Sequence, residues 1–100
     1  MSRPGGQTTA FATDASATVT NTSAQIIAIG LQRGALLIHN PSATVSMAIA
    51  PTPTVPVIGS VGLQLPPGGT LFLDGPKTAN AFNGIASAAG PTNVVIWVWN

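Results

Sequence analysis

Charged side chains are scarce in this chain of 100 residues: five residues carry a charge, whereas about a quarter of the residues of an average soluble protein do. They are Arg3, Arg33, Lys77, Asp14 and Asp74. Surface charges keep a free protein soluble and discourage exposed sheet edges from pairing with neighbours. The shortage therefore predicts a structural role, with a surface that is covered by other copies or by a larger assembly.

Cysteine is absent, which excludes a disulfide framework, a thiolate zinc site and a cysteine nucleophile. A net charge of +1 provides no general attraction to nucleic acids or to anionic membranes. The longest apolar runs, at 35–38 and 94–99, are far shorter than the roughly 20 residues that cross a bilayer. Because residues 1–9 lack the apolar core of a signal peptide, we expect synthesis in a cytosol and no membrane partner.

Short segments of β-forming residues, separated by glycine and proline, dominate the rest of the chain. The strands are expected over 18–20, 24–29, 35–39, 44–49, 62–65, 70–74, 82–88 and 94–99, with one helical turn over 79–82. Roughly seven or eight short antiparallel strands with turns at this spacing are typical of a β-sandwich or a jelly roll. We therefore predict an all-β domain over 18–100, preceded by an extended N-terminal arm over 1–17.

Residues that could support catalysis are few and scattered. Asp14 lies in the predicted arm, whereas Asp74 precedes Gly-Pro and fits a turn. His39 is the only histidine, and no second ligand type follows it at a spacing suited to a metal. The chain contains neither a G-x-S-x-G motif nor a phosphate-binding loop. Its three cations are too widely spread for a nucleic-acid site. We therefore predict no catalytic, metal or cofactor site, and a protein that is not an enzyme.

Two segments bear on assembly. The end of the chain, 94–100, is strongly β-forming and uncharged, and it would promote aggregation if it lay on an open sheet edge. It is either a central strand or a subunit contact through one face, with Val95, Trp97 and Trp99 on one side and Val94, Ile96 and Val98 on the other. The N-terminal arm either pairs with a neighbour by strand addition or is disordered.

Parts of the sequence resemble small virion proteins of tailed bacteriophages. Residues 33–42 are similar to their R-x-x-L-x-I-x-N-P/S segment, and residues 62–71 resemble their G-x-x-L-x-P-G turn before a strand. The end of the chain, 82–98, is similar to the closing hairpin of such proteins. The resemblance implies a structural protein without catalytic residues, most like a capsid decoration (cement) protein. A tail, adaptor or fibre component of the virion is the second possibility.

The resulting hypothesis is a non-enzymatic protein that is made in the cytoplasm of the bacterial host and then decorates and stabilises the outer capsid surface of a phage particle. Its partners would be the major capsid protein and copies of itself in a homotrimer, without nucleic acid or a small-molecule substrate. An alternative is a small carbohydrate-binding module, in which Trp97 or Trp99 acts together with Asn100. The candidate interface residues are Arg3, Thr8, Thr9, Phe11, Trp97 and Trp99.

Overall fold

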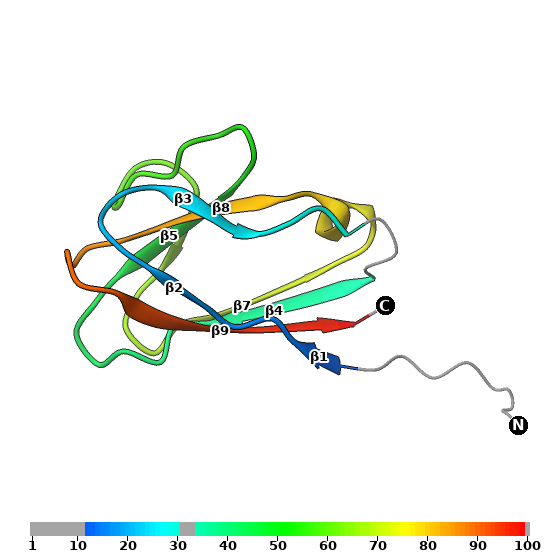
Figure 1. Cartoon of the computed structure of the whole chain (residues 1–100), viewed down its shortest axis with the longest axis horizontal. Coiled ribbons are helices and arrows are strands. Elements are labelled where there is room, and N and C mark those ends of the chain that lie inside the picture. Colours follow the sequence, from blue (N-terminus) through cyan, green and yellow to red (C-terminus); the bar gives the residue numbers. More distant parts are fainter. Residues whose placement is uncertain (1–11, 31–33, 100) are drawn as a thin grey trace, which may run out of the picture.

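The chain folds into two antiparallel β-sheets that face each other in a computed structural model, which describes residues 12–30 and 34–99 (Figure 1). The five-stranded sheet consists of β1 (Ala12–Asp14), β2 (Ala17–Val19), β4 (Ala35–His39), β7 (Thr70–Asp74) and β9 (Thr92–Trp99). The four-stranded sheet consists of β3 (Ala24–Ile27), β5 (Met47–Pro51), β6 (Leu63–Leu65) and β8 (Phe82–Ala86). A short 3₁₀ turn, η1 (Pro76–Ala79), lies between β7 and β8.

The strands pair in a nested order. β1 and β2 pair in succession with β9, β3 pairs with β8, β4 with β7, and β5 with β6. Two further pairings, β4 with β9 and β5 with β8, join these pairs into the two sheets. One sheet therefore has the order β1/β2–β9–β4–β7, and the other has the order β3–β8–β5–β6.

The all-β architecture predicted from the sequence is confirmed. β4 and β7 have the predicted bounds, and the other predicted strands are found with ends displaced by a few residues. The helical turn lies at 76–79 rather than at 79–82, because Pro76 supplies the fixed φ that suits the first position of a helix. Asn83 and Gly84, which could have formed a hairpin turn, continue strand β8; the irregularity lies opposite them, between Gln25 and Ile27 of β3.

The structure describes residues 12–17 of the N-terminal arm that the sequence predicts over 1–17, ahead of the domain predicted over 18–100. Residues 1–11 lie outside the described residues, and for them the arm stays a prediction. Residues 12–14 form β1, which pairs with β9 in the register Ala12 to Trp99, and Ala17 begins β2. This part of the arm is therefore an edge of the five-stranded sheet.

The core lies between the sheets and follows from the alternation of side chains along each strand. Leu36 and Ile38 of β4 and Val94 and Ile96 of β9 are fully buried. The second sheet contributes Ile27, Met47, Ile49, Leu65, Phe82 and Ala86. Burying one such large aliphatic side chain is worth about 1.5–3 kcal/mol, so this two-sided cluster is the main source of stability.

Strand β5 is buried on both faces, unlike the strands that alternate. Met47 and Ile49 face the core, and Ala48 and Ala50 on the opposite side are also inaccessible. The loop after β5 folds back over it at Gly62, where an added Cβ atom would lie 2.7 Å from Ile49 O and 3.3 Å from the Ala50 side chain. Small side chains on the outer face of β5 thus let this loop pack closely against the sheet.

Asn40 is a fully buried polar residue that connects the two facing sheets at one end. Its side-chain Nδ2 donates to Val45 O (2.7 Å), Leu65 O (3.2 Å) and Pro66 O (3.2 Å), and its Oδ1 accepts from Ser42 N (3.1 Å). Ser42 and Val45 lie in the connection from β4 to β5, whereas Leu65 ends β6 and Pro66 follows it. One amide thereby joins the end of β4 to the second sheet.

Replacing Asn40 with Asp should destabilise the fold by about 2–4 kcal/mol at neutral pH. The change is nearly isosteric, but it removes the amide donor and turns a carboxylate oxygen toward three carbonyl oxygens. Urea unfolding followed by tryptophan fluorescence would measure the loss. Asn93→Asp, at an exposed position of β9, is the matched control. An Asn40→Asp protein as stable as the control would show that the amide network is dispensable.

Candidate interaction surface

The outer face of the five-stranded sheet carries a continuous group of apolar side chains. Leu37 of β4 lies opposite Phe72 of β7 on one side and opposite Trp97 of β9 on the other. Val95 and Trp99 point to the same side of β9 as Trp97, because successive side chains of a strand alternate. We call Leu37, Phe72, Val95, Trp97 and Trp99 together the aromatic face.

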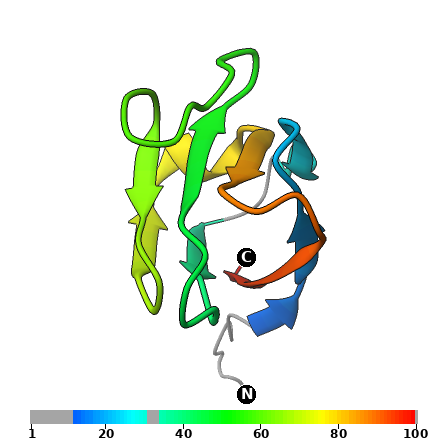
Figure 2. The same cartoon turned by 90° about the vertical axis from the view of Figure 1, so that its left-hand side faces the viewer.

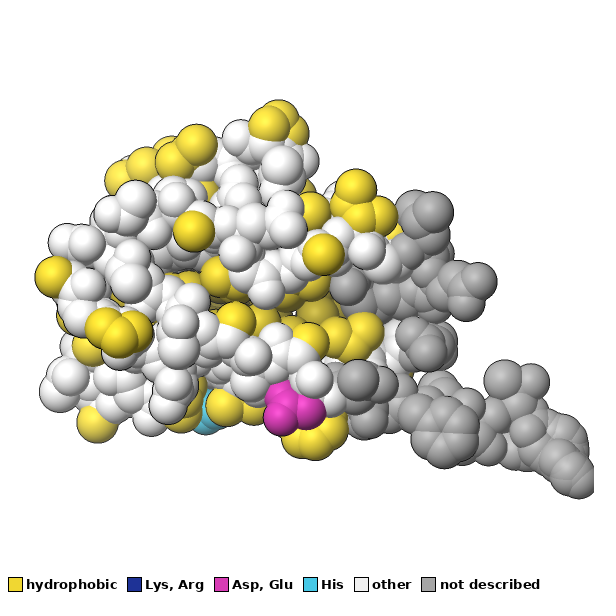
Figure 3. All heavy atoms as spheres, in the orientation of Figure 1, with side chains coloured by type: hydrophobic (Ala, Val, Ile, Leu, Met, Phe, Trp, Pro, Cys, Tyr) yellow, Lys and Arg dark blue, Asp and Glu magenta, His cyan; other side chains and the backbone are white. Residues whose placement is uncertain are grey.

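Two members of the aromatic face are well exposed: Phe72 by 56% and Trp97 by 38%. The other three are half-buried by their neighbours. In the space-filling view, some hydrophobic atoms are visible at the lower edge of the molecule, beside the histidine and an acidic side chain (Figure 3). Contiguous exposed apolar side chains of this kind mark sites of association on soluble proteins.

The aromatic rings are inclined to one another rather than coplanar. The centroids of Phe72 and Trp99 lie 6.1 Å apart, with an angle of 63° between the ring planes. An edge-to-face pair of this kind is a favourable arrangement within a packed protein surface. It does not form the single flat platform on which a sugar ring would stack.

Polar groups border the aromatic face and are engaged in hydrogen bonds. His39 Nδ1 lies 2.8 Å from Thr70 Oγ1, across the β4–β7 pair. This contact gives His39 a structural partner at the end of β4. On the other side of the face, Asp14 of β1 lies opposite Trp97.

Asp14 also connects the two segments of the sheet edge. Its Oδ1 accepts from Ser16 N (2.8 Å), and Ser16 Oγ accepts from Ile96 N (3.1 Å). These bonds attach the edge to β9 at the interruption between β1 and β2. Hydrogen bonds from the Ser16 side chain, and then from its backbone, hold the pKa of the exposed Asp14 carboxyl below its ordinary value.

Replacing Ser16 with Ala should raise the pKa of Asp14 toward its ordinary value, because the larger of the two stabilising hydrogen bonds is lost. Carboxyl NMR titration of the wild type and the variant would measure the change, with Thr18→Ala as the control. Since the folded-state pKa is lowered, this contribution to stability exists above the unfolded pKa of about 3.9 and is lost as the pH falls through the folded-state value. An unchanged titration would contradict the assigned bonds.

A second apolar surface is formed by the loop over residues 52–62, which we call the valine loop; it is the green segment at the top of Figure 2. It exposes Val55, Val57 and Val61. Gln64 holds its backbone: Oε1 accepts from Gly59 N (2.9 Å), and Nε2 lies 3.2 Å from the carbonyl oxygens of Val57 and Val61. The loop thus presents apolar side chains from a hydrogen-bonded framework.

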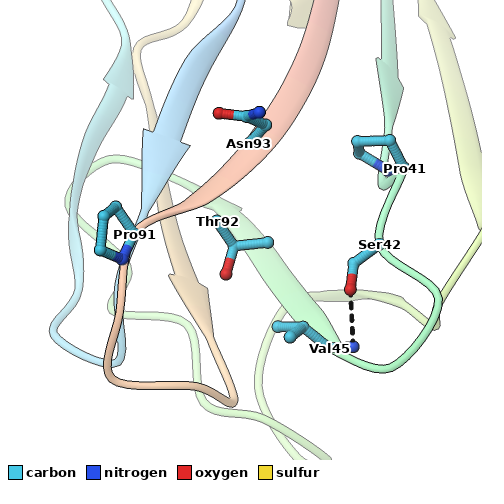
Figure 4. A pocket seen from close by; sticks show the side chains of 6 residues that line it. All are labelled: Pro41, Ser42, Val45, Pro91, Thr92 and Asn93. Carbon is cyan, nitrogen blue, oxygen red and sulfur yellow. Dashed lines mark hydrogen bonds between the residues drawn. The ribbon is translucent and has the colours of Figure 1, made fainter.

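The depression drawn in Figure 4 offers little for catalysis. It is lined by Pro41, Ser42, Val45, Pro91, Thr92 and Asn93, none of which is an acid or a base. The hydroxyl of Ser42, the one serine of this lining, already accepts from Val45 N (2.9 Å) and Thr44 N (3.1 Å). A serine nucleophile also needs an adjacent base, which this lining does not include.

Within residues 12–30 and 34–99, no cluster of three or more His, Cys, Asp or Glu side chains is placed to hold a metal ion. In the same part of the chain, no helix has the length and apolarity needed to span a membrane.

The structure places two of the six candidate interface residues. Trp97 and Trp99 lie on one face of β9, as the alternation predicted, and that face is the outer one. The other candidates, Arg3, Thr8, Thr9 and Phe11, lie outside the described residues, as does Asn100 of the carbohydrate hypothesis. Sequence reasoning missed Phe72 and Leu37, which the register of β4 brings beside Trp97.

Comparisons with protein-family models, with curated proteins and with solved structures gave no match for this chain.

Proposed function

We propose that this protein is a non-enzymatic structural subunit that decorates and stabilises the outer capsid surface of a phage particle. The observation that carries the proposal is the combination of two exposed apolar surfaces, the aromatic face and the valine loop, with a chain that has only five charged residues. Burying uncharged surface avoids the cost of desolvating unpaired ions. The molecule is therefore suited to protein contacts repeated over many copies.

We also propose that the sandwich is a jelly roll. If β1 and β2 count as one interrupted strand, each sheet has four strand positions, and the strands pair from the outermost inward along the chain. A long antiparallel hairpin wrapped around itself has this order, and viral capsid and lectin domains use it. The fold does not fix the function, so the exposed side chains have to carry the assignment.

The exposed apolar surfaces and the scarcity of charge support a structural protein, and the resemblance of the sequence to small virion proteins of tailed bacteriophages supports a phage capsid as its location. A decoration protein needs an interface of roughly 1,600 Å² with a well-packed core to remain attached as a single contact. Less area per contact suffices when several linked copies bind together. The proposed partners are the major capsid protein and copies of this chain; a tail, adaptor or fibre position would differ in its copy number per particle.

Trp97→Lys should weaken binding to capsids that lack this protein by about 30-fold or more, as expected for an aromatic residue at the centre of an interface. Wild type should bind at a fixed copy number, measured by co-sedimentation and quantitative gel analysis. Thr22→Lys adds the same charge on an exposed loop and serves as the control. Failure of the wild type to bind capsids would refute the decoration role.

Deleting residues 2–11 in the same experiment would test the predicted arm without disturbing β1, whose pairing with β9 begins at Ala12. The truncated protein should fold normally and lose capsid occupancy. Unchanged occupancy would show that the arm is not a capsid contact, while leaving the aromatic face to be tested by Trp97→Lys.

A carbohydrate-binding module is the second candidate, because Phe72 and Trp97 expose aromatic surface on a sheet face. The 63° inclination between Phe72 and Trp99 counts against it, since sugar rings stack on flat platforms. Tryptophan fluorescence distinguishes the two proposals. Glycans that shift the emission of the free protein would favour sugar binding, whereas protection from a soluble quencher only on assembled particles would favour a capsid contact.

A further inference from the structure

Strand β7 differs from the other sheet edges because it has no interruption, bulge or proline, and its one charged residue, Asp74, lies at its end. The edge made by β1 and β2 is interrupted at Ala15 and Ser16, and β3 has a register shift between Gln25 and Ile27. β6 has three residues and is followed by two prolines. Natural proteins use such interruptions, bulges, short strands and prolines to prevent edge-to-edge association. β7 has five residues in unbroken register with β4 and contains neither proline nor lysine.

The backbone groups that β7 turns outward can be identified from the hydrogen bonds at the two ends of its ladder. Asn40 N donates to Gly69 O (2.9 Å) at one end, and Gly75 N donates to Gly34 O (3.1 Å) at the other. In an antiparallel pair, hydrogen-bonded positions recur at every second residue. The backbone groups of Leu71 and Leu73 therefore bond to β4. The N–H and C=O of Phe72 point sideways in the opposite direction, out of the open edge of the sheet.

The sequence of β7 is also self-complementary. Thr-Leu-Phe-Leu-Asp reads as polar, leucine, phenylalanine, leucine, polar in both directions. If a second copy pairs antiparallel about a two-fold axis at Phe72, then Phe72 faces Phe72 and Leu71 faces Leu73. Phe72 then occupies a hydrogen-bonded position, which matches the outward direction of its backbone groups.

We infer that β7 is a self-association edge, through which two copies of this chain form an antiparallel, two-fold β7–β7 pair centred on Phe72. An aromatic pair directly across two strands is favourable, and the same patch serves both copies, as a two-fold interface requires. Leu71 and Leu73 face inward but remain half-buried at the open edge, so a second strand would cover them.

This pairing has a consequence for the aromatic face. Phe72 belongs to that face, so the pair would join the aromatic faces of two copies into one continuous surface. The contact would supply one of the self-associations that the proposed function needs, but its test uses the purified protein alone. A closed two-fold pair contains two chains, whereas the sequence led us to expect a trimer.

Charge substitution at Phe72 tests the pair by light scattering. Wild type should have twice the 10.0 kDa chain mass. Phe72→Lys and Phe72→Glu, each alone, should have the mass of one chain, because like charges would face each other across the axis. An equal mixture of the two variants should recover the dimer, since the facing charges are then opposite. Thr22→Lys, on an exposed loop outside the aromatic face and the valine loop, should remain dimeric.

Amide hydrogen exchange provides a test without substitutions. In the wild type at dimer-forming concentration, exchange at Phe72 should slow at least tenfold relative to a dilute sample, whereas exchange at Leu71 should stay protected in both. Circular dichroism of the two Phe72 variants should match that of the wild type, since the side chain is exposed.

Several results would overturn the proposal: a wild type that is monomeric at every concentration, an oligomer that survives Phe72→Lys, or a mixture that fails to recover the dimer. Fast exchange at Phe72 within a dimer would do the same. A dimer that does not bind capsids would refute the proposed function and leave this contact intact. A monomer that binds them would refute the contact alone.

Discussion

The buried amide of Asn40 is the constraint on which the arrangement of the two sheets depends. Hydrophobic burial holds the sheets together but is not directional, so it does not determine how they are aligned. The hydrogen bonds of Asn40 to Val45, Leu65 and Pro66 are directional. They connect the end of β4 to the segment that enters β5 and to the segment that leaves β6, both of which belong to the second sheet. The alignment of β4 with β7 follows, because Asn40 also bonds through its backbone to Gly68 and Gly69.

Local patterns in the sequence predicted the strands because alternation and glycine–proline turns are local signals. They correctly bounded β4 and β7 and assigned Val94 and Ile96 to one face of β9. They could not predict which strands pair, since pairing depends on contacts between distant residues. The hydrogen-bond network of Asn40 was therefore not predictable. Its partners Leu65 and Pro66 are distant in the sequence and lie beside Asn40 only in the folded structure.

The aromatic face was also predictable only where it depends on local pattern. The two tryptophans of β9 share a face by alternation alone, whereas their proximity to Phe72 requires the register of β4 between them. Burial also separates the two faces of β9 in a way that composition cannot: Ile96 is fully buried, while Trp97 is 38% exposed. An exposed tryptophan beside a buried isoleucine fits the proposed use of the outer face as a contact surface.

Phe72 lies at the edge of the sheet and also on its outer face, and these two surfaces point in perpendicular directions. Its backbone N–H and C=O point sideways from β7, whereas its ring stands out from the sheet beside Trp99. Pairing through the edge therefore leaves the ring face available. It would also double the apolar area that one assembled unit presents to a larger partner. Because linked surfaces bind with an effective concentration set by their connection, two weak faces held side by side can attach more firmly than the area of either would allow. A chain with very few charges can thus gain affinity through symmetry rather than through ion pairs.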